Sequence, residues 1–123
     1  MGDLTLNFSK WEFRCKCGCP KTVLDLDFIQ KLQDARSVAG VPFNINSGYR
    51  CAAHNASIGG DPESLHLTGE AADIKTPNSS RAFIIHGSLH TVGFRRFKLY
   101  PRHIHTDSGR GKVKSVLMWG SYK

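Results

Sequence analysis

Histidine and aspartate side chains at two places in the chain could together hold a metal ion. His103 and His105 form the triplet "HIH", which on a strand would point both imidazoles to the same face. His66 and Asp73 lie in "SLHLTGEAADI", residues 64–74, with small residues between them. Mixed histidine and aspartate ligands suit zinc, which in catalytic sites takes three protein ligands and keeps one position for water. We therefore expect a mononuclear zinc site among these four side chains, and a group of satisfied polar residues is the alternative.

The other histidines fit a metal site less well. His86 and His90 are four residues apart on a predicted helix and would share a face. The zincin pattern requires a glutamate directly after the first histidine, whereas Gly87 stands there. We expect this pair to lie at the surface or the edge of the core, and His54 to be a loop residue outside the site.

Four short motifs resemble, in order and spacing, the zinc D-Ala-D-Ala carboxypeptidase family of peptidoglycan peptidases. The superfamily also includes lysostaphin-type endopeptidases and the hedgehog signalling domain. The resemblance covers about residues 8–120, and "FRCKCGC" near the start and "HTDSG" near the end are most similar to small phage and bacterial members. The motifs are "SGYR" at 47–50, "HN" at 54–55, S-x-H-x-x-G-x-A-x-D at 64–73 and "HIHTD" at 103–107.

The resemblance implies that His66, Asp73 and His105 ligate a single catalytic Zn²⁺ ion. It also implies that Arg50 and Ser64 hold a carboxylate of the substrate, for which the guanidinium fork is well shaped. A structural salt bridge is the alternative role for Arg50.

The general base is the position at which this sequence departs from part of the family. Some members have a glutamate three residues before the last zinc histidine, where this chain has Arg102. Hedgehog and lysostaphin-type members have a histidine two residues before it, which matches His103, so the resemblance implies that His103 handles protons. Asp107 is the alternative base, or else a partner that orients His105. Glu70 is expected to have no catalytic role.

The elements that must position these residues alternate between helix and strand. Gly69 would let the chain turn, and Ala71 and Ala72 would let a strand pack closely beneath the metal. We expect one α+β domain over residues 1–123, similar to the hedgehog and DD-peptidase fold, with a small, mostly antiparallel sheet and two or three helices. The predicted elements are an irregular arm with a cysteine cluster (1–20), a helix from Asp25 or Asp27 to Gly40, a strand in 43–50, a loop in 51–63 that holds at most a short helical turn, a strand in 70–76, a helix capped by Ser79 and Ser80 and closed by Gly93, two strands around Pro101, and a last strand in 113–121.

Four cysteines leave three possibilities open. Cys15, Cys17, Cys19 and Cys51 could form two disulfides, bind a second, structural zinc, or remain buried free thiols. The C-x-C-x-C spacing differs from the usual C-x-x-C of zinc knuckles. A link from the arm to Cys51 would brace the loop that carries Arg50.

The formal charge of +7 would attract polyanions such as cell-wall polymer, and a purely solubilising role for this charge is the alternative. The densest basic region runs from Arg95 to Lys114, but no nucleic-acid-binding motif accompanies it. No apolar run is long enough to span a membrane, and no secretory signal is visible. We expect a monomer that does not insert into a membrane. It would be made in a cytoplasm, or located in the host cytoplasm or the virion if it comes from a phage, and it would act on the cell wall or periplasm.

Taken together, the residues and the resemblance predict a zinc metallopeptidase that hydrolyses stem peptides of peptidoglycan. A DD-carboxypeptidase or an endopeptidase, including a phage endolysin, would fit. A non-catalytic binding module stabilised by zinc on the same fold is the alternative, and nucleic-acid binding through residues 95–114 is a third hypothesis.

Overall fold

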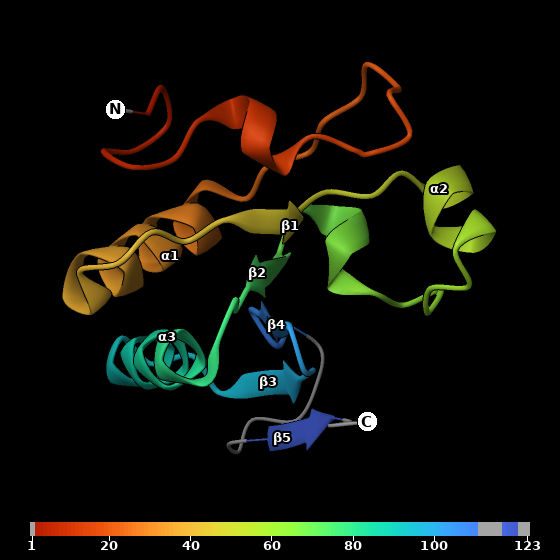
Figure 1. Ribbon diagram of the computed structural model, residues 1–123. Helices are drawn as coiled ribbons and strands as arrows, with labels where there is room; N and C mark the ends of the chain where they lie inside the picture. The colour runs from red at the N-terminus through yellow and green to blue at the C-terminus, as the bar shows by residue number, and fades with distance from the viewer. Residues whose placement is uncertain (1, 111–116, 121–123) are drawn as a thin grey trace.

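One five-stranded sheet and two long helices make up most of the structure, a computed structural model that describes residues 2–110 and the backbone of residues 117–120. The strands lie in the order β1-β2-β4-β3-β5 (Figure 1). They are β1 (Ile45–Ser47), β2 (Ala71–Lys75), β3 (Arg96–Leu99), β4 (His103–Asp107) and β5 (Leu117–Gly120). The α-helices are α1 (Leu26–Ala39), α2 (Ala52–Ser57) and α3 (Ser79–Thr91), and the 3-10 helices are η1 (Lys10–Phe13) and η2 (Leu65–Thr68).

The sheet is antiparallel except at one edge. β2 pairs antiparallel with β1 and β4, and β3 pairs antiparallel with β4. Only the pairing of β3 with β5 is parallel among the described strands. The predicted α+β class with a small, mostly antiparallel sheet is therefore confirmed.

Helix α1 begins and ends where its sequence predicts. The Asp25 side chain caps the first turn by accepting a hydrogen bond from the Phe28 amide at 2.9 Å. Gly40 ends the helix in the left-handed conformation, with φ of 68°, which a glycine adopts without steric cost. Between these ends, Phe28, Ile29 and Leu32 are buried against the rest of the core.

Helix α3 is capped by a different residue from the predicted pair. The side chain of Asn78 accepts a hydrogen bond from the Arg81 amide at 2.9 Å, so Ser79 and Ser80 are the first helical residues and not the cap. A short polar side chain stands at all three positions, and only the extended backbone of Asn78, with φ of −155°, distinguishes the cap. Gly93, with φ of 98°, follows the end of the helix as predicted.

The core lies between the sheet and the two long helices. In Figure 1, α1 and α3 lie together to the left of the stacked strands, and α2 lies to their right. Ile85 and Leu89 of α3 are fully buried with Phe97 and Ile104 from the sheet. This arrangement covers one face of the sheet and leaves the other face available for a site.

The N-terminal arm is less irregular than predicted. It contains η1, and Phe8 and Phe13 pack edge to face with ring centroids 5.6 Å apart. Phe8 also contacts Phe43, which precedes β1. The predicted loop between β1 and β2 contains the short helix α2, in agreement with the short helical turn allowed there.

Part of the basic C-terminal region lies outside the described residues. Of the predicted strand in 113–121, the backbone of β5 is described, while Lys112, Lys114 and the side chain of Trp119 are not. Within the described residues, none of the helices has the length and apolar character needed to cross a membrane.

Candidate metal centre

Strand register brings the predicted metal ligands together. Asp73 on β2 is the direct antiparallel partner of His105 on β4. His66 arrives from η2, which precedes β2 and ends at Gly69. Gly69 has a φ of 74°, and any Cβ there would overlap the carbonyl oxygen of Val23, so the tight turn from η2 into β2 requires glycine. The three side chains each offer a ligand atom, and these atoms all lie within 4.8 Å of one another.

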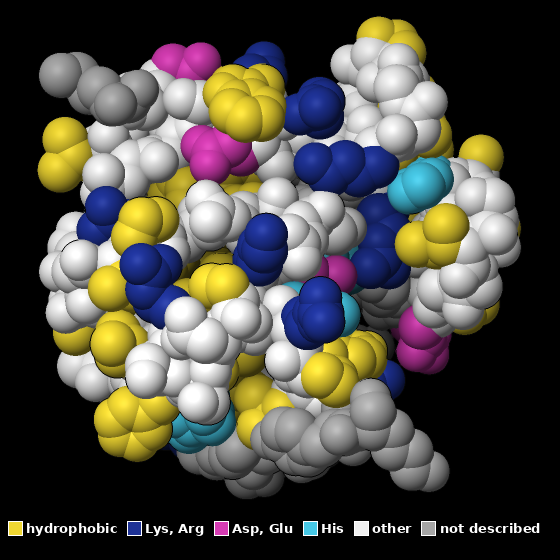
Figure 2. Space-filling model, in the orientation of Figure 1, with side chains coloured by type: hydrophobic (Ala, Val, Ile, Leu, Met, Phe, Trp, Pro, Cys, Tyr) yellow, Lys and Arg dark blue, Asp and Glu magenta, His cyan; other side chains and the backbone are white. Residues whose placement is uncertain are grey.

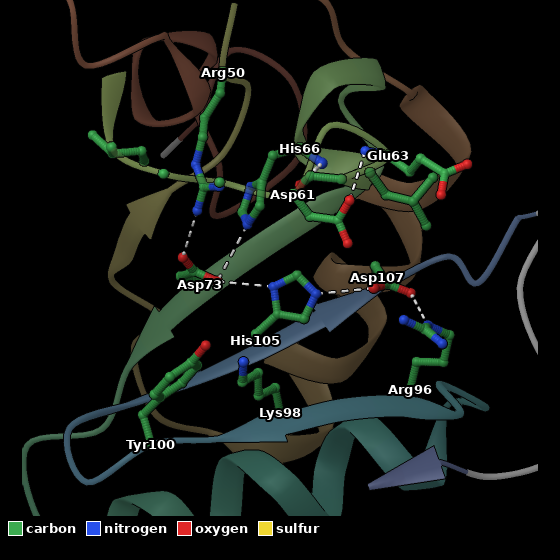
Figure 3. Close-up of a pocket in the computed structure, with 15 residues that line it drawn as sticks. Arg50, Asp61, Glu63, His66, Asp73, Arg96, Lys98, Tyr100, His105 and Asp107 are labelled. Atoms are coloured by element: carbon green, nitrogen blue, oxygen red, sulfur yellow. Dashed lines mark hydrogen bonds and ion pairs between the residues drawn. The ribbon is translucent and has the colours of Figure 1, made fainter. Parts of the chain in front are cut away.

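His66 is held in one tautomer and one orientation. Its Nδ1 lies 2.6 Å from the carbonyl oxygen of Gly48 and therefore carries the proton that it donates there. The other ring nitrogen, Nε2, then has a free lone pair. That atom is buried, makes no hydrogen bond with any residue that the structure describes, and lies 3.3 Å from Oδ1 of Asp73 (Figure 3). A buried, unpartnered lone pair that faces a carboxylate oxygen is the environment of a metal ligand.

His105 presents one nitrogen to the same carboxylate and the other to a second one. Nε2 lies 2.9 Å from Oδ2 of Asp107, and Nδ1 lies 3.0 Å from Oδ1 of Asp73. With Nε2 protonated, Nδ1 turns its lone pair to the point that His66 and Asp73 also face. In this way Asp107 orients His105 from behind.

These distances fit a zinc ion. Three electron-pair donors crowd one point, and they repel one another unless a cation or proton lies between them. Zinc bonds of about 2.0–2.1 Å in tetrahedral geometry place neighbouring nitrogen and oxygen ligands about 3.3 Å apart. The separations of 3.0 and 3.3 Å from Asp73 to the two histidines are close to that value.

The pKa values of Asp73 and His105 reflect how closely these two groups face each other. Burial by itself would raise the pKa of Asp73, but its contacts with His105 and His66 outweigh burial and hold that pKa well below its usual range. Burial would lower the pKa of His105, yet its contacts with Asp107 and Asp73 raise it. The Asp73 carboxylate is therefore ionised at neutral pH and can receive a cation.

Asp107 is held by several contacts. Besides His105, it accepts a hydrogen bond from Nε of Arg96 at 2.9 Å. Burial favours its neutral form, but His105 and Arg96 outweigh burial and lower the pKa of Asp107. A carboxylate stabilised in this way is a weak proton acceptor, and so its geometry suits the orienting role better than that of a base.

Arg50 lies against the predicted metal ligands and also makes structural contacts. Its guanidinium donates to Oδ2 of Asp73 at 3.4 Å, to the Asn55 side chain at 3.2 Å and to Oγ of Ser47 at 3.3 Å. These bonds use three of the five N–H donors that an arginine carries. Both roles foreseen for Arg50, a structural ion pair and a substrate contact, are compatible with this placement.

Ser64 lies beside the site as the cap of η2. Its Oγ accepts a hydrogen bond from the backbone N–H of His66 at 3.2 Å. The hydroxyl hydrogen remains available to donate, and the residue lines the same pocket as the metal ligands. Its position therefore combines support of His66 with access to a bound molecule.

His103 lies at the edge of the site. As the alternation of β4 requires, it shares a sheet face with His105, and its ring stacks on Tyr100 with centroids 4.1 Å apart. Burial lowers the pKa of His103, which favours the neutral imidazole. It is Tyr100, rather than His103, that lines the pocket around the metal ligands.

Comparison with known proteins assigns the family. The family model described as Peptidase M15 matches residues 6–107, which include most of the N-terminal arm and every residue of the centre described above. The chain belongs to the Peptidase M15 family. A search of curated proteins finds no match to this M15 peptidase. Family membership supports a metallopeptidase that uses zinc, and the donor set of His66, Asp73 and His105 fits that ion.

The metal centre of this M15 peptidase lies at the bottom of an open pocket of about 380 Å³. Figure 2 shows Lys and Arg side chains around this hollow, between the main body and the α2 lobe, with acidic and histidine side chains inside it. Side chains from β3 and from the loop after α2 complete the lining. They include Asp61, Glu63, Arg96, Lys98 and Tyr100 (Figure 3).

Three of these pocket residues could have been found from the sequence. Arg96, Lys98 and Tyr100 alternate along "RFKLY", so they share the face of β3 that points to the pocket, while Phe97 is buried on the other face. Lys98 is also the direct partner of His105 in the sheet. The alternation of polar and apolar residues in this segment predicts that one face of the strand points to the site and the other to the core.

The remaining polar candidates take the structural places that were expected. His86 and His90 contact each other, with their Nε2 atoms 3.1 Å apart, and both rings pack against Phe97, away from the metal ligands. Buried Glu70 accepts a hydrogen bond from Thr68 at 2.6 Å and pairs with Arg110 at 2.7 Å. These contacts fasten the start of β2 to the chain beyond β4.

Proposed function

We propose that this M15 peptidase is a zinc enzyme that hydrolyses peptide bonds in peptidoglycan stem peptides, as a carboxypeptidase or an endopeptidase. The observation that carries the proposal is the buried, unpartnered Nε2 of His66, aimed at the carboxylate of Asp73 at the bottom of an open pocket. A centre that only stabilised the fold would be closed by a fourth protein ligand, whereas three ligands at a pocket leave a position for a reacting molecule.

The protein side chains supply order and charge at this centre. When bound, zinc would polarise the scissile carbonyl group and lower the pKa of a water molecule. His66, Asp73 and His105 would hold the ion, and Gly48 and Asp107 fix the two imidazoles through their far nitrogens. Fixed ligands need no reorganisation when the substrate arrives, which favours catalysis over mere binding.

His103 is the residue that we propose for proton transfer. It precedes the ligand His105 by two residues on the same strand face, and its stacking on Tyr100 sets the plane of its ring. A neutral imidazole at this edge could accept a proton from water and later donate it to the leaving amine.

Cationic side chains suit a substrate that carries carboxylates. Arg50, Arg96 and Lys98 line the pocket on two sides of the metal ligands. Two N–H donors of Arg50 that its three hydrogen bonds leave over, together with the Ser64 hydroxyl, could bind the terminal or side-chain carboxylate of a stem peptide. This contact would place the scissile bond next to the metal position.

Digestion of purified muropeptides by the zinc-loaded chain, followed by mass spectrometry, tests the proposal. We expect a defined stem-peptide fragment that disappears with a chelator and returns when zinc is added. His66→Ala should abolish cleavage, whereas His90→Ala, which removes an exposed histidine outside the centre, should retain it.

Two results would contradict the proposal. Full zinc occupancy without cleavage of any muropeptide would favour a binding module in place of an enzyme. Cleavage of unrelated peptides in preference to muropeptides would support peptidase activity but contradict peptidoglycan as the substrate.

A further inference from the structure

Four cysteine side chains form a second cluster away from the histidine and aspartate centre. Three come from the N-terminal arm and the fourth, Cys51, from the start of α2. The sulfur of Cys15 lies 3.3 Å from that of Cys17 and 3.7 Å from that of Cys51, and the last two sulfurs are also 3.7 Å apart. With Cys19 included, all four sulfurs lie within 4.8 Å of one another.

This spacing is that of a tetrahedral metal thiolate centre. Zinc–sulfur bonds of about 2.3 Å place neighbouring sulfurs about 3.8 Å apart in a tetrahedron. Four sulfurs that all approach one another in this way surround a common point, whereas two disulfides would require only two close pairs.

The backbone around the cysteines supports thiolates. The sulfurs of Cys15, Cys17 and Cys51 each face a backbone N–H at 3.4 Å, from Cys51, Cys19 and His54 respectively. N–H groups directed at sulfur stabilise the charged form that binds a metal. Three such contacts in one cluster are independent of the sulfur distances and point to the same ligand.

A glycine turn explains how the unusual C-x-C-x-C spacing converges. Gly18 has a φ of 85°, and its N–H donates to the carbonyl oxygen of Cys15 at 3.3 Å. This turn folds Cys17 and Cys19 back beside Cys15. In C-x-x-C knuckles, one turn brings the two cysteines together. Here a glycine between the second and third cysteines provides the turn.

We propose that Cys15, Cys17, Cys19 and Cys51 bind a structural zinc ion, distinct from the ion of the histidine and aspartate centre. Four protein ligands fill a tetrahedral site, so this ion has no open position for a substrate. Its role is to fasten the N-terminal arm to the segment before α2. That segment carries Gly48, whose carbonyl oxygen orients His66, and Arg50, which contacts Asp73.

Metal content of the full chain tests the proposal. After reconstitution with zinc and removal of the excess, wild-type protein should hold two ions per chain by elemental analysis. His66→Ala should hold one, and Cys17→Ser should also hold one. Lys16→Ala, which replaces an exposed residue between two of the cysteines, is the matched control and should hold two.

Cobalt substitution identifies the ligands of each ion. Cobalt bound to thiolates gives an intense sulfur-to-metal charge-transfer absorption in the near ultraviolet, which histidine and carboxylate ligands do not give. We expect this band in His66→Ala, where only the cysteine cluster can bind. If Cys17→Ser fails to fold, the His66→Ala spectrum alone decides the question.

Three outcomes would overturn the proposal: a single zinc ion in the wild-type chain that Cys17→Ser retains and His66→Ala loses, no charge-transfer band in His66→Ala, or two disulfides in the reconstituted protein by non-reducing mass analysis. None of these measurements requires a substrate. If they reject the cysteine site, the proposed peptidase function is unaffected. If no muropeptide is cleaved, the proposed cysteine site is unaffected.

Discussion

The histidine and aspartate centre and the cysteine cluster are built on different kinds of backbone. Two of the three ligands of the first centre stand on paired strands, where the ladder between β2 and β4 sets Asp73 opposite His105. The cysteines stand on an arm and a helix cap that are far apart in sequence, and a few loop contacts such as the Tyr49 N–H bond to Phe13 bring these together. The first centre is therefore prearranged by the sheet, and the second gains most of its order from what it binds.

Because of this difference, we expect mutations in the two regions to have different effects. Substitutions beside the histidine and aspartate centre should change activity or metal affinity while the fold is retained. Substitutions in loops and turns should act first on stability.

His103→Ala should retain zinc at the histidine and aspartate centre and lose most of the activity. Loss of a group that transfers protons costs about 10²–10⁴-fold in turnover. Elemental analysis and muropeptide turnover at saturating substrate measure the two effects separately. His86→Ala, on α3, is the control and should retain activity. Loss of zinc from His103→Ala would instead make His103 a ligand.

Gly69→Ala should destabilise the fold, because the turn between η2 and β2 has no room for a Cβ. The left-handed backbone and the overlap with the Val23 carbonyl group together should lower the free energy of unfolding by roughly 3 kcal/mol. Chemical denaturation measures this change. Gly59→Ala has a similar φ of 71° but no atom within 4 Å, so it should cost only about 1 kcal/mol. Equal losses in the two variants would show that the contact with Val23 carries no weight.

Asp107→Asn should weaken zinc binding without removing a ligand. The amide oxygen is a poorer acceptor for Nε2–H of His105, and loss of such a partner typically costs about 10–100-fold in metal affinity. Competition with a fluorescent chelator gives the affinity. Asp61→Asn, in the exposed part of the pocket lining, should leave it unchanged. An unchanged affinity in Asp107→Asn would reject the orienting role.

Asn78→Ala should affect stability alone, since α3 lies away from both clusters. Removal of a helix cap costs about 1 kcal/mol, and metal content should stay the same. Thermal unfolding compared with Ser79→Ala checks the assignment of the cap. A larger loss in the serine variant would restore the pair predicted from the sequence.

The same contrast explains what could be predicted from the sequence. Local signals placed α1 between Asp25 and Gly40, and period-two alternation placed β4, because these elements depend on neighbouring residues. The family motif marked His66, Asp73 and His105 as a set. The sequence left open whether the cysteines converge, because this depends on how the arm packs against the segment before α2, a contact between residues 36 apart.

Side-chain direction was harder to predict than element type. The contact of Asp107 with both His105 and Arg96 favours the role of orienting partner over that of base, and no spacing rule describes a contact with β3. Likewise, the choice of Asn78 over Ser79 as a cap depends on one extended dihedral angle.

The contact between His66 and Gly48 has a practical consequence for protein engineering. The acceptor that aims this imidazole is a main-chain oxygen on a residue without a side chain, so alanine scanning of polar groups would never detect it. It can be moved only through the backbone, and a methyl group at Gly48 would press on Cα of Phe13 at 2.8 Å. Libraries meant to retune the candidate metal centre should therefore vary Phe13, a residue that does not line the pocket, before they vary the pocket itself.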